Sequence, residues 1–283
     1  MSLLTVVILT LNEEERIARC LRSLEPLLPN VRVVIIDSWS KDQTLEVAEK
    51  TWRKMGARSD ALALLTQTWK GFTETRQASL KWVKTPWVLW LDADEWLTRE
   101  LVDELRQLPR APSESDALVY RIPRLSYFLG RPIRHGGWYP DRKSRLAQAA
   151  LCEWKPGPRG ADVHEDLFPV RMAHGFGLLH GHIEHEPFRN EGEQGETNRR
   201  YSTLLGEGLA RSRLERGLAP PHPWWIRLRG VWKFFENYIW KGGFLDGRPG
   251  YLIARGSSDS LRLRYECARA RMLAPSVRPQ SQE

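Results

Sequence analysis

Cysteine is scarce in this chain of 283 residues. The three cysteines, Cys20, Cys152 and Cys267, lie far apart and show none of the paired spacing that is typical of metal ligands. An odd number of isolated cysteines argues against a disulfide framework and against a structural zinc ribbon. We therefore expect the protein to work in a reducing cytosol.

Long apolar runs are also lacking. The N-terminal stretch LLTVVILTL has no basic region before it and leads into the charged NEEER, so it predicts neither a signal peptide nor a membrane span. No other segment approaches the roughly 20 apolar residues that a membrane-spanning helix needs. We expect a protein that is not integral to a membrane.

A glycine-rich phosphate loop is missing too. Neither G-x-x-x-x-G-K nor G-x-G-x-x-G occurs, so a bound nucleotide would need another means of neutralising its phosphates. Residues 87–96, WVLWLDADEW, suggest one, because a strand-forming run ends in Asp92, Asp94 and Glu95. Mg²⁺ or Mn²⁺ held on carboxylates can bridge substrate phosphates. The alternative is that Asp94 and Glu95 only favour the N-terminus of a helix near residues 98–107.

A phosphatase that forms an aspartyl-phosphate also places D-x-D after a strand, with the first acid as the nucleophile. In that class the motif follows the first strand and has Thr or Val two residues after its second acid. Here position 96 is Trp and the strand is the fourth. We therefore rank the phosphatase interpretation below the metal site.

Short strand-like runs alternate with helical spacing over the first hundred residues. The runs cover residues 3–9, 31–36, 61–65 and 87–91. This order predicts an α/β fold with a mostly parallel sheet flanked by helices. Ligands bind at the carboxyl ends of the strands in open sheets of this kind. Three polar groups follow the first, second and fourth strands and should share one crevice: Asn12 to Glu14, Asp37, and Asp92 to Glu95.

The second half of the chain is organised differently. Residues 194–216 and 223–240 have helical spacing. One face of the second segment collects Trp224, Leu228, Val231, Trp232, Phe235 and Ile239, with Lys and Arg among them. We divide the chain into a catalytic domain at 1–190, a helical C-terminal extension at 191–273 and a disordered tail at 274–283.

Basic residues and tryptophan are abundant. The net charge is +8 and there are 13 tryptophans. This combination suggests an anionic partner with an amphipathic boundary, which is a membrane surface, an acidic glycolipid or a nucleic acid. The apolar face of residues 223–240 fits either contact with a membrane or ordinary packing in the core.

Six motifs, in their order and spacing, resemble an inverting glycosyltransferase of family 2. They are TVVILTLNEEERIARCLRSL, VVIIDSWSKDQT, WVLWLDADE, GWYPDRKSRL, VHE and HGHIEH. Within that family they are most similar to the lipopolysaccharide core β-1,4-glucosyltransferases of Gram-negative bacteria. The resemblance covers roughly residues 3–270 and implies a GT-A (Rossmann-like) fold, a UDP-sugar donor with UDP-glucose expected, and Mg²⁺ or Mn²⁺ as cofactor.

The resemblance implies a nucleotide pocket at the ends of the first two strands. Asp37 would contact the uracil or the ribose. Beside it would lie the backbone of Thr10, Leu11, Asn12 and Glu13. The chain departs from the family pattern Asp-Ser-Gly-Ser-Thr-Asp-Gly-Thr at three positions, where it has Trp39, Lys41 and Gln43. Two glycines are lost, and with them backbone freedom, so this pocket should differ in detail from the family's.

The resemblance also implies a metal site after the fourth strand. Asp92, with Ala93, would face the ribose or the surroundings of the metal, and Asp94 would ligate the metal. His185 would be a further ligand of the metal or the diphosphate, and His180 also matches the family pattern. The alternative for the histidine-rich HGHIEHE is a separate zinc site.

An inverting transfer needs a base for the acceptor hydroxyl. The position that matches the family's base is Glu165, in VHED. Adjacent Asp166 is the second candidate, and His164 would orient the base or ligate the metal. The alternative is that these residues form an ordinary surface loop.

Two classes of function remain. The first is a metal-dependent UDP-sugar transferase, peripheral to the cytosolic face of the inner membrane, that acts on a lipopolysaccharide core glycolipid. A polyprenyl-phosphate glycosyl synthase is the alternative within that class. The second is a basic lipid- or nucleic-acid-binding protein without catalysis. Only the first explains acids that line one crevice, so we expect anionic membrane, and no nucleic acid, among the partners.

Overall fold

The structure is a computed structural model that describes residues 2–109, 112, 117–156, 165–170 and 176–274. The chain divides into two compact units. Unit 1 comprises residues 1–126 and 140–186, and unit 2 comprises residues 127–139 and 187–283. Residues 127–139, a hairpin, therefore belong with the C-terminal helices.

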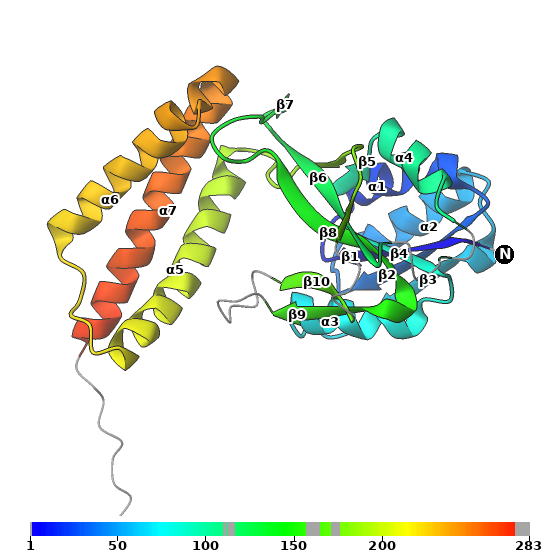
Figure 1. Cartoon of the computed structure of the whole chain (residues 1–283), viewed down its shortest axis with the longest axis horizontal. Coiled ribbons are helices and arrows are strands. Elements are labelled where there is room, and N and C mark those ends of the chain that lie inside the picture. The colour runs from blue at the N-terminus through cyan, green and yellow to red at the C-terminus, as the bar shows by residue number, and fades with distance from the viewer. Residues whose placement is uncertain (1, 110–111, 113–116, 157–164, 171–175, 275–283) are drawn as a thin grey trace, which may run out of the picture. The chain divides into compact units, whose positions relative to one another are not determined.

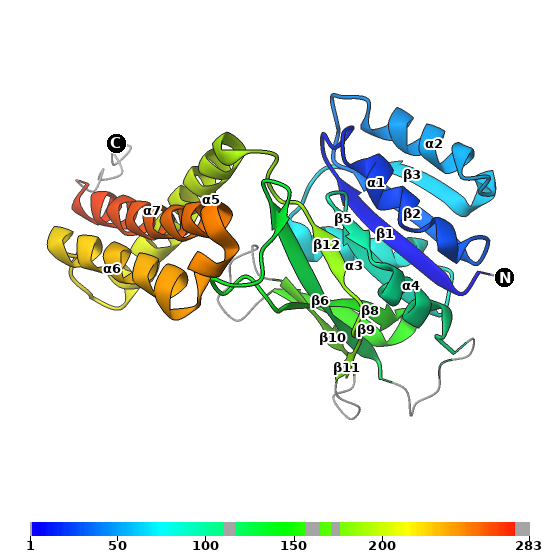
Figure 2. The same cartoon turned by 90° about the horizontal axis from the view of Figure 1, so that it is seen from above.

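Four parallel strands form the first half of the sheet in unit 1. They are β1 (Leu4–Thr10), β2 (Val31–Asp37), β3 (Leu62–Thr66) and β4 (Trp87–Asp92). They lie in the order β3-β2-β1-β4. β1, at the centre, is buried along its whole length, as expected of a β-branched run covered on both faces. The predicted α/β fold with a parallel sheet is confirmed over these strands (Figures 1 and 2).

Beyond β4 the sheet becomes mixed. Its further strands are β5 (Glu95–Leu97), β6 (Val119–Phe128), β8 (Asp141–Gln148), β11 (Phe176–Leu178) and β12 (Ile183–His185). β8 runs antiparallel to both β4 and β6, and β12 runs parallel to β6 but antiparallel to β5. A hairpin of β9 (Cys152–Pro156) and β10 (Glu165–Pro169) forms a separate small sheet. The parallel arrangement that the first strands predict thus ends at β4.

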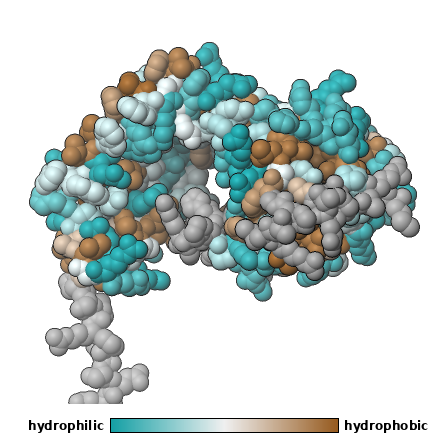
Figure 3. Space-filling model, in the orientation of Figure 1, coloured by the Kyte–Doolittle hydropathy of each residue, from teal (hydrophilic) through white to brown (hydrophobic). Residues whose placement is uncertain are grey.

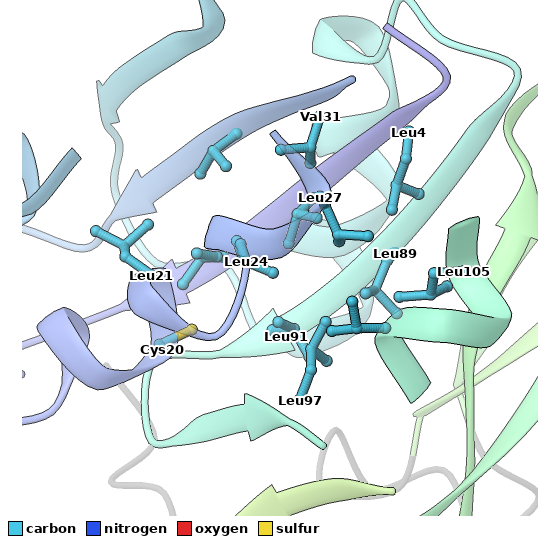
Figure 4. Close-up of a cluster of buried hydrophobic side chains, with 14 of the residues drawn as sticks. Leu4, Cys20, Leu21, Leu24, Leu27, Val31, Leu89, Leu91, Leu97 and Leu105 are labelled. Atoms are coloured by element: carbon cyan, nitrogen blue, oxygen red, sulfur yellow. The ribbon is translucent and has the colours of Figure 1, made fainter. Parts of the chain in front are cut away.

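The two faces of the sheet are covered differently because strand residues alternate between them. Side chains such as Ile8 pack with helices α1 (Ile17–Arg22), α2 (Thr44–Lys54) and α4 (Arg99–Arg106). Figure 4 shows part of this cluster, including Leu21, Leu89 and Leu105. On the other face, Val7 and Trp90 pack with residues of α3 (Phe72–Ser79) and of the β9–β10 hairpin. Two cores therefore fix the strand ends that carry the acids.

The described residues of unit 2 include three long helices: α5 (Glu191–Glu215), α6 (Pro223–Phe235) and α7 (Gly247–Leu273). α7 packs against both of the others (Figure 1). The hairpin strand β7 (Arg131–Pro132) pairs with the end of β6, and Phe128 and Ile133 pack on Ile253 of α7. None of the helices within the described residues is both long and apolar enough to cross a bilayer.

The helix predicted at residues 223–240 changes character near its end. α6 stops at Phe235, and one π-helical turn, Glu236–Trp240, continues it. α6 contacts α7 through Gly230, where an added Cβ would lie 2.5 Å from the Arg262 side chain, and Ser258 donates a hydrogen bond to the Gly230 carbonyl (2.8 Å). The side of α6 that meets its neighbour is therefore not the face with the regularly spaced large apolar residues.

That apolar face is exposed. We call it the α6 face, and it consists of Trp224, Leu228, Val231, Trp232, Phe235 and Ile239. Trp240, Phe244 and Leu245 follow it and are also exposed. Hydrophobic side chains gather along the edge of unit 2 that α6 forms (Figure 3).

Candidate nucleotide and metal site

The loops that follow β1 and β2 are tied together by hydrogen bonds. The backbone N–H of Asn12 donates to Ser40 Oγ, and the backbone N–H of Lys41 donates to Asn12 Oδ1, both at 2.8 Å. The N–H of Glu13 donates to Thr44 Oγ1, also at 2.8 Å. Asn12 has φ +57°, a left-handed conformation that asparagine tolerates. The predicted pocket residues Thr10 to Glu13 therefore lie in a rigid double loop at the carboxyl ends of two neighbouring strands.

Asp37 forms the floor of this double loop. It pairs with Thr10 in the register of β2 with β1, and only 1% of it is exposed. Its carboxylate accepts hydrogen bonds from the backbone N–H of Ser40 (2.9 Å) and from the Ser40 hydroxyl. In the same two loops, the side chains of Leu11 and Trp39 are exposed. The predicted contact of Asp37 with uracil or ribose stays a prediction, and in this structure the carboxylate holds the loop.

Asp92 is clamped between two arginines. Arg76 of α3 lies 2.6 Å from one carboxylate oxygen and Arg145 of β8 lies 2.7 Å from the other. Burial acts to raise the pKa of Asp92, but the charges of Arg145 and Arg76 outweigh it and hold that pKa far below its usual range. Asp92 is therefore a carboxylate in the folded protein, with its charge already neutralised.

Glu95 is neutralised in the same way. It is fully buried, and its carboxylate meets Arg124 of β6 at 3.0 Å and Arg145 at 3.4 Å. It also accepts the backbone N–H of Asp92 at 3.0 Å. Two of the three acids after β4 thus serve a buried network with arginines. Neither Asp94 nor Glu95 is the cap of the following helix, because Thr98 is the N-cap of α4 and accepts the N–H of Leu101.

The third acid, Asp94, faces a histidine. Its Oδ2 lies 3.5 Å from Nε2 of His185, and both side chains are partly open to solvent, at 19% and 13%. β12 pairs with β5 so that His185 lies opposite Glu95, and this pairing brings His185 close to Asp94. Burial acts to raise the pKa of Asp94, but the charge of His185 and its hydrogen bond have the larger, opposite effect. The pKa of Asp94 is therefore below its usual value.

This pair fits a divalent cation. Nδ1 of His185 lies 3.1 Å from the Ser126 hydroxyl, which leaves Nε2 directed at Asp94. Metal-bound histidines typically make such a hydrogen bond through the second ring nitrogen. Mg²⁺ and Mn²⁺ commonly use one or two protein ligands and take the others from water and substrate phosphates. Asp94 and His185 would hold the ion. Asp92 would not ligate it, because both of its carboxylate oxygens pair with arginines, and Ala93 has no ligating side chain.

The other two histidines of the HGHIEHE segment are held at α4 through their backbone. The N–H of His180 donates to Glu104 of α4, and the N–H of His182 donates to Thr98. Across the described part of the chain, no three Asp, Glu, His or Cys side chains gather so that they could hold a metal. Nothing there supports a separate zinc site.

The proposed base lies only partly within the described residues. Glu165 begins β10 and pairs with Pro156 of β9, but its side chain, like all of His164, lies outside the described residues. Asp166 is described, and its Oδ1 accepts the N–H of the next residue, Leu167, at 2.9 Å. The assignment of Glu165 as base, with Asp166 as the second candidate, stays a prediction.

Three residues of the site were not found from the sequence: Arg76, Arg124 and Arg145. They come from α3, β6 and β8, and in a chain with 43 lysines and arginines a single arginine gives no signal. The sequence does carry one sign for Arg145, which is the only charged residue in the run SRLAQAA.

Comparisons with known proteins give one consistent family. The model of glycosyl transferase family 2 matches residues 5–157. A similar curated protein is the lipopolysaccharide core biosynthesis glycosyltransferase LpsC of Rhizobium meliloti, 28% identical over 265 residues that cover 89% of this chain and 88% of LpsC. An uncharacterized glycosyltransferase of Rickettsia typhi, RT0209, is 29% identical over 146 residues, which cover 52% of this chain and 43% of its own length.

Two solved structures are similar to this chain over most of its length. TarS of S. aureus (residues 1–349), in complex with UDP-GlcNAc, has a TM-score of 0.48 at 18% identity and covers 95% of this chain and 92% of its own. The mannosyltransferase PcManGT of Pyrobaculum calidifontis, in complex with GDP-Man and Mn²⁺, has a TM-score of 0.46 at 15% identity and covers 97% and 76%.

Proposed function

Because the chain belongs to glycosyltransferase family 2, we propose that it transfers a hexose, with glucose the expected sugar, from a UDP-sugar to the inner core of lipopolysaccharide. The observation that carries the proposal is the Asp94–His185 pair at the end of β4, beside the double loop after β1 and β2. The similarity to LpsC over most of both chains supports a lipopolysaccharide core acceptor.

The reaction would be a single displacement with inversion. The acceptor hydroxyl attacks the anomeric carbon while the bond from that carbon to the UDP oxygen breaks, through an oxocarbenium-like transition state. The proton of the hydroxyl passes to the Glu165 carboxylate, or to Asp166 if the base lies one residue further along. A bound Mg²⁺ or Mn²⁺ supplies positive charge for the departing diphosphate.

The buried arginines explain why Asp94 is the acid that remains available to a cation. Three negative charges beside a diphosphate would repel it. Asp92 and Glu95 are neutralised by the arginines Arg76, Arg145 and Arg124. Of the three acids, Asp94 is therefore the one whose carboxylate is not paired with an arginine and can bind a cation. The network therefore supports one metal-binding acid in a site that stays compatible with an anionic substrate.

We place the protein on the cytosolic face of the inner membrane, where it would meet a glycolipid acceptor. The exposed α6 face offers tryptophan and phenylalanine for the headgroup boundary, and exposed Arg227 and Arg229 lie among them. Lys233 and Lys241 both pair with Glu236, at 3.1 and 2.5 Å, so they contribute less net positive charge. This arrangement suits peripheral contact with anionic lipid.

The test is a donor and acceptor panel. The full chain is incubated with UDP-glucose, UDP-galactose or UDP-GlcNAc, with Mn²⁺ or EDTA, and with lipopolysaccharide that lacks its core hexoses or with a polyprenyl phosphate. We expect metal-dependent incorporation of one hexose, glucose, into the lipopolysaccharide. Transfer to polyprenyl phosphate alone would move the assignment to a polyprenyl-phosphate glycosyl synthase, and undiminished transfer in EDTA would contradict the metal site.

A further inference from the structure

One bulky residue of the nucleotide loops has a left-handed backbone. Among the described non-glycine residues, Asn12, Trp39 and Leu129 have positive φ, and Trp39 has φ +66°. An L-residue pays a steric penalty there, and asparagine is one of the few side chains that tolerate it. Trp39 stands where the family pattern has glycine, which would carry no such penalty. A strained tryptophan at this position therefore needs a reason.

The loop holds Trp39 in this conformation from both sides. Before it, the N–H of Ser38 donates to the Thr10 carbonyl at 3.0 Å. After it, the N–H of Ser40 donates to Asp37 and the N–H of Lys41 donates to Asn12 Oδ1. Strained backbone of this kind persists only where its surroundings fix it, and it gathers at functional sites.

The strain does not serve packing in the core, because the Trp39 side chain is 63% exposed. The neighbouring acid, Asp37, is buried and bonded to Ser40, so its carboxylate holds the loop, while the Trp39 indole is open to solvent. A rigidly held, open indole at a strand end is suited to stacking on a flat ring.

The distance between Trp39 and the Asp94–His185 pair suits the length of a nucleoside diphosphate. β1 lies between β2 and β4, so two strand spacings of about 5 Å each separate the end of β2 from the end of β4. In a nucleoside diphosphate, a ribose and a phosphate separate the base from the terminal phosphate. With the diphosphate at Asp94 and His185, the base falls near the end of β2. We infer that Trp39 is the stacking platform for the pyrimidine base of the donor, an inference that rests on the proposed function.

The experiment uses four versions of the full chain: wild type, Trp39→Asn, Trp39→Phe and Leu129→Asn. Leu129 is the matched control, because it is the other bulky residue with positive φ (+52°) and lies in the β6–β7 turn of unit 2. Calorimetry with Mn²⁺ measures the affinity for UDP and for inorganic diphosphate, and thermal unfolding without ligand measures the melting temperature.

We expect both asparagine variants to melt about 2 °C higher, since each relieves the same strain. Trp39→Asn should bind UDP about tenfold more weakly and diphosphate unchanged, as loss of one base–aromatic stack implies. Trp39→Phe and Leu129→Asn should bind UDP with an affinity within about threefold of the wild type. This change is smaller than the loss of affinity expected when a base–aromatic stack is removed.

Equal UDP affinity of Trp39→Asn and wild type would overturn the inference while leaving the proposed function intact. An equal loss of UDP and diphosphate affinity would also overturn it, because it would show damage to the site rather than loss of a base contact. Failure of the wild type to bind UDP with Mn²⁺ would overturn both.

Discussion

His185 Nε2 lies 3.5 Å from Asp94 Oδ2, although the two residues are far apart in the chain. The short antiparallel pairing of β12 with β5 creates this contact, since His185 lies opposite Glu95, the residue after Asp94. Asp94 differs from its acidic neighbours in this respect, because Asp92 and Glu95 are held by arginines. The sequence D-A-D-E therefore contains two structural acids and one that is available to a cation.

The arginine network should be needed for folding. Arg145→Met removes the arginine that Asp92 and Glu95 share in the protein interior. Removal of one partner of a buried ion pair lowers the free energy of unfolding by about 3–5 kcal/mol. The control is Arg53→Met, which breaks an exposed ion pair with Glu49 and should cost at most about 1 kcal/mol. Urea unfolding of both variants measures the difference, and equal losses would contradict the structural role of the network.

Asp92 should also make stability depend on pH. Its folded pKa is depressed, so its contribution is fully present above the unfolded pKa of about 4 and is lost as the pH falls below that value toward the folded pKa. Asp92→Asn should be less stable than wild type at pH 7, and the gap should narrow between about pH 4 and 3. Unfolding free energies at several pH values test this, and a gap that does not change with pH would rule out the arginine-paired carboxylate.

Glu165→Gln should keep donor binding and lose turnover. The amide has nearly the same shape but cannot accept the proton of the acceptor hydroxyl, and loss of a general base typically lowers the rate by about 10² to 10⁴-fold. Transfer assays at saturating UDP-sugar, with UDP affinity measured in parallel, give the two readouts. The paired variant is Asp166→Asn, and if it loses turnover while Glu165→Gln retains it, the base is Asp166.

The first half of the site could be predicted because its signals are local. Each buried strand is a continuous apolar run, and the polar residue after it must lie at a strand end, which is how Asp37 and Asp94 were placed. The roles of Asp92 and Glu95 could not be read this way. They depend on arginines from α3, β6 and β8, and those contacts exist only once strands distant in sequence have paired.

The orientation of α6 shows the same limit. Helical spacing correctly grouped its apolar residues on one face, but spacing cannot tell which side of a helix meets its neighbour. Gly230 allows α7 to approach on another side, so the α6 face is exposed rather than buried against α7.

The α6 face should bind anionic membranes. Each basic residue near such a surface contributes about 1 kcal/mol, so Arg227→Glu with Arg229→Glu should weaken binding by about 30-fold or more. The matched control reverses two exposed basic residues of unit 1, Arg53→Glu with Lys54→Glu. Sedimentation with phosphatidylglycerol vesicles at low and high salt is the measurement. If the α6 variant sediments as wild type does, another surface makes the contact.

The metal pair itself is tested most directly by UDP binding with and without a cation. Calorimetric titration of UDP into wild type, Asp94→Asn and Asp103→Asn, in Mn²⁺ or in EDTA, isolates one carboxylate. Asp103 is the control, since it is a half-exposed acid of α4 paired with Arg106. We predict that wild type and Asp103→Asn bind UDP at least about tenfold more tightly in Mn²⁺ than in EDTA, because the cation links the carboxylate to the diphosphate, and that Asp94→Asn loses this difference. Equal UDP affinity of the wild type in Mn²⁺ and in EDTA would contradict the account.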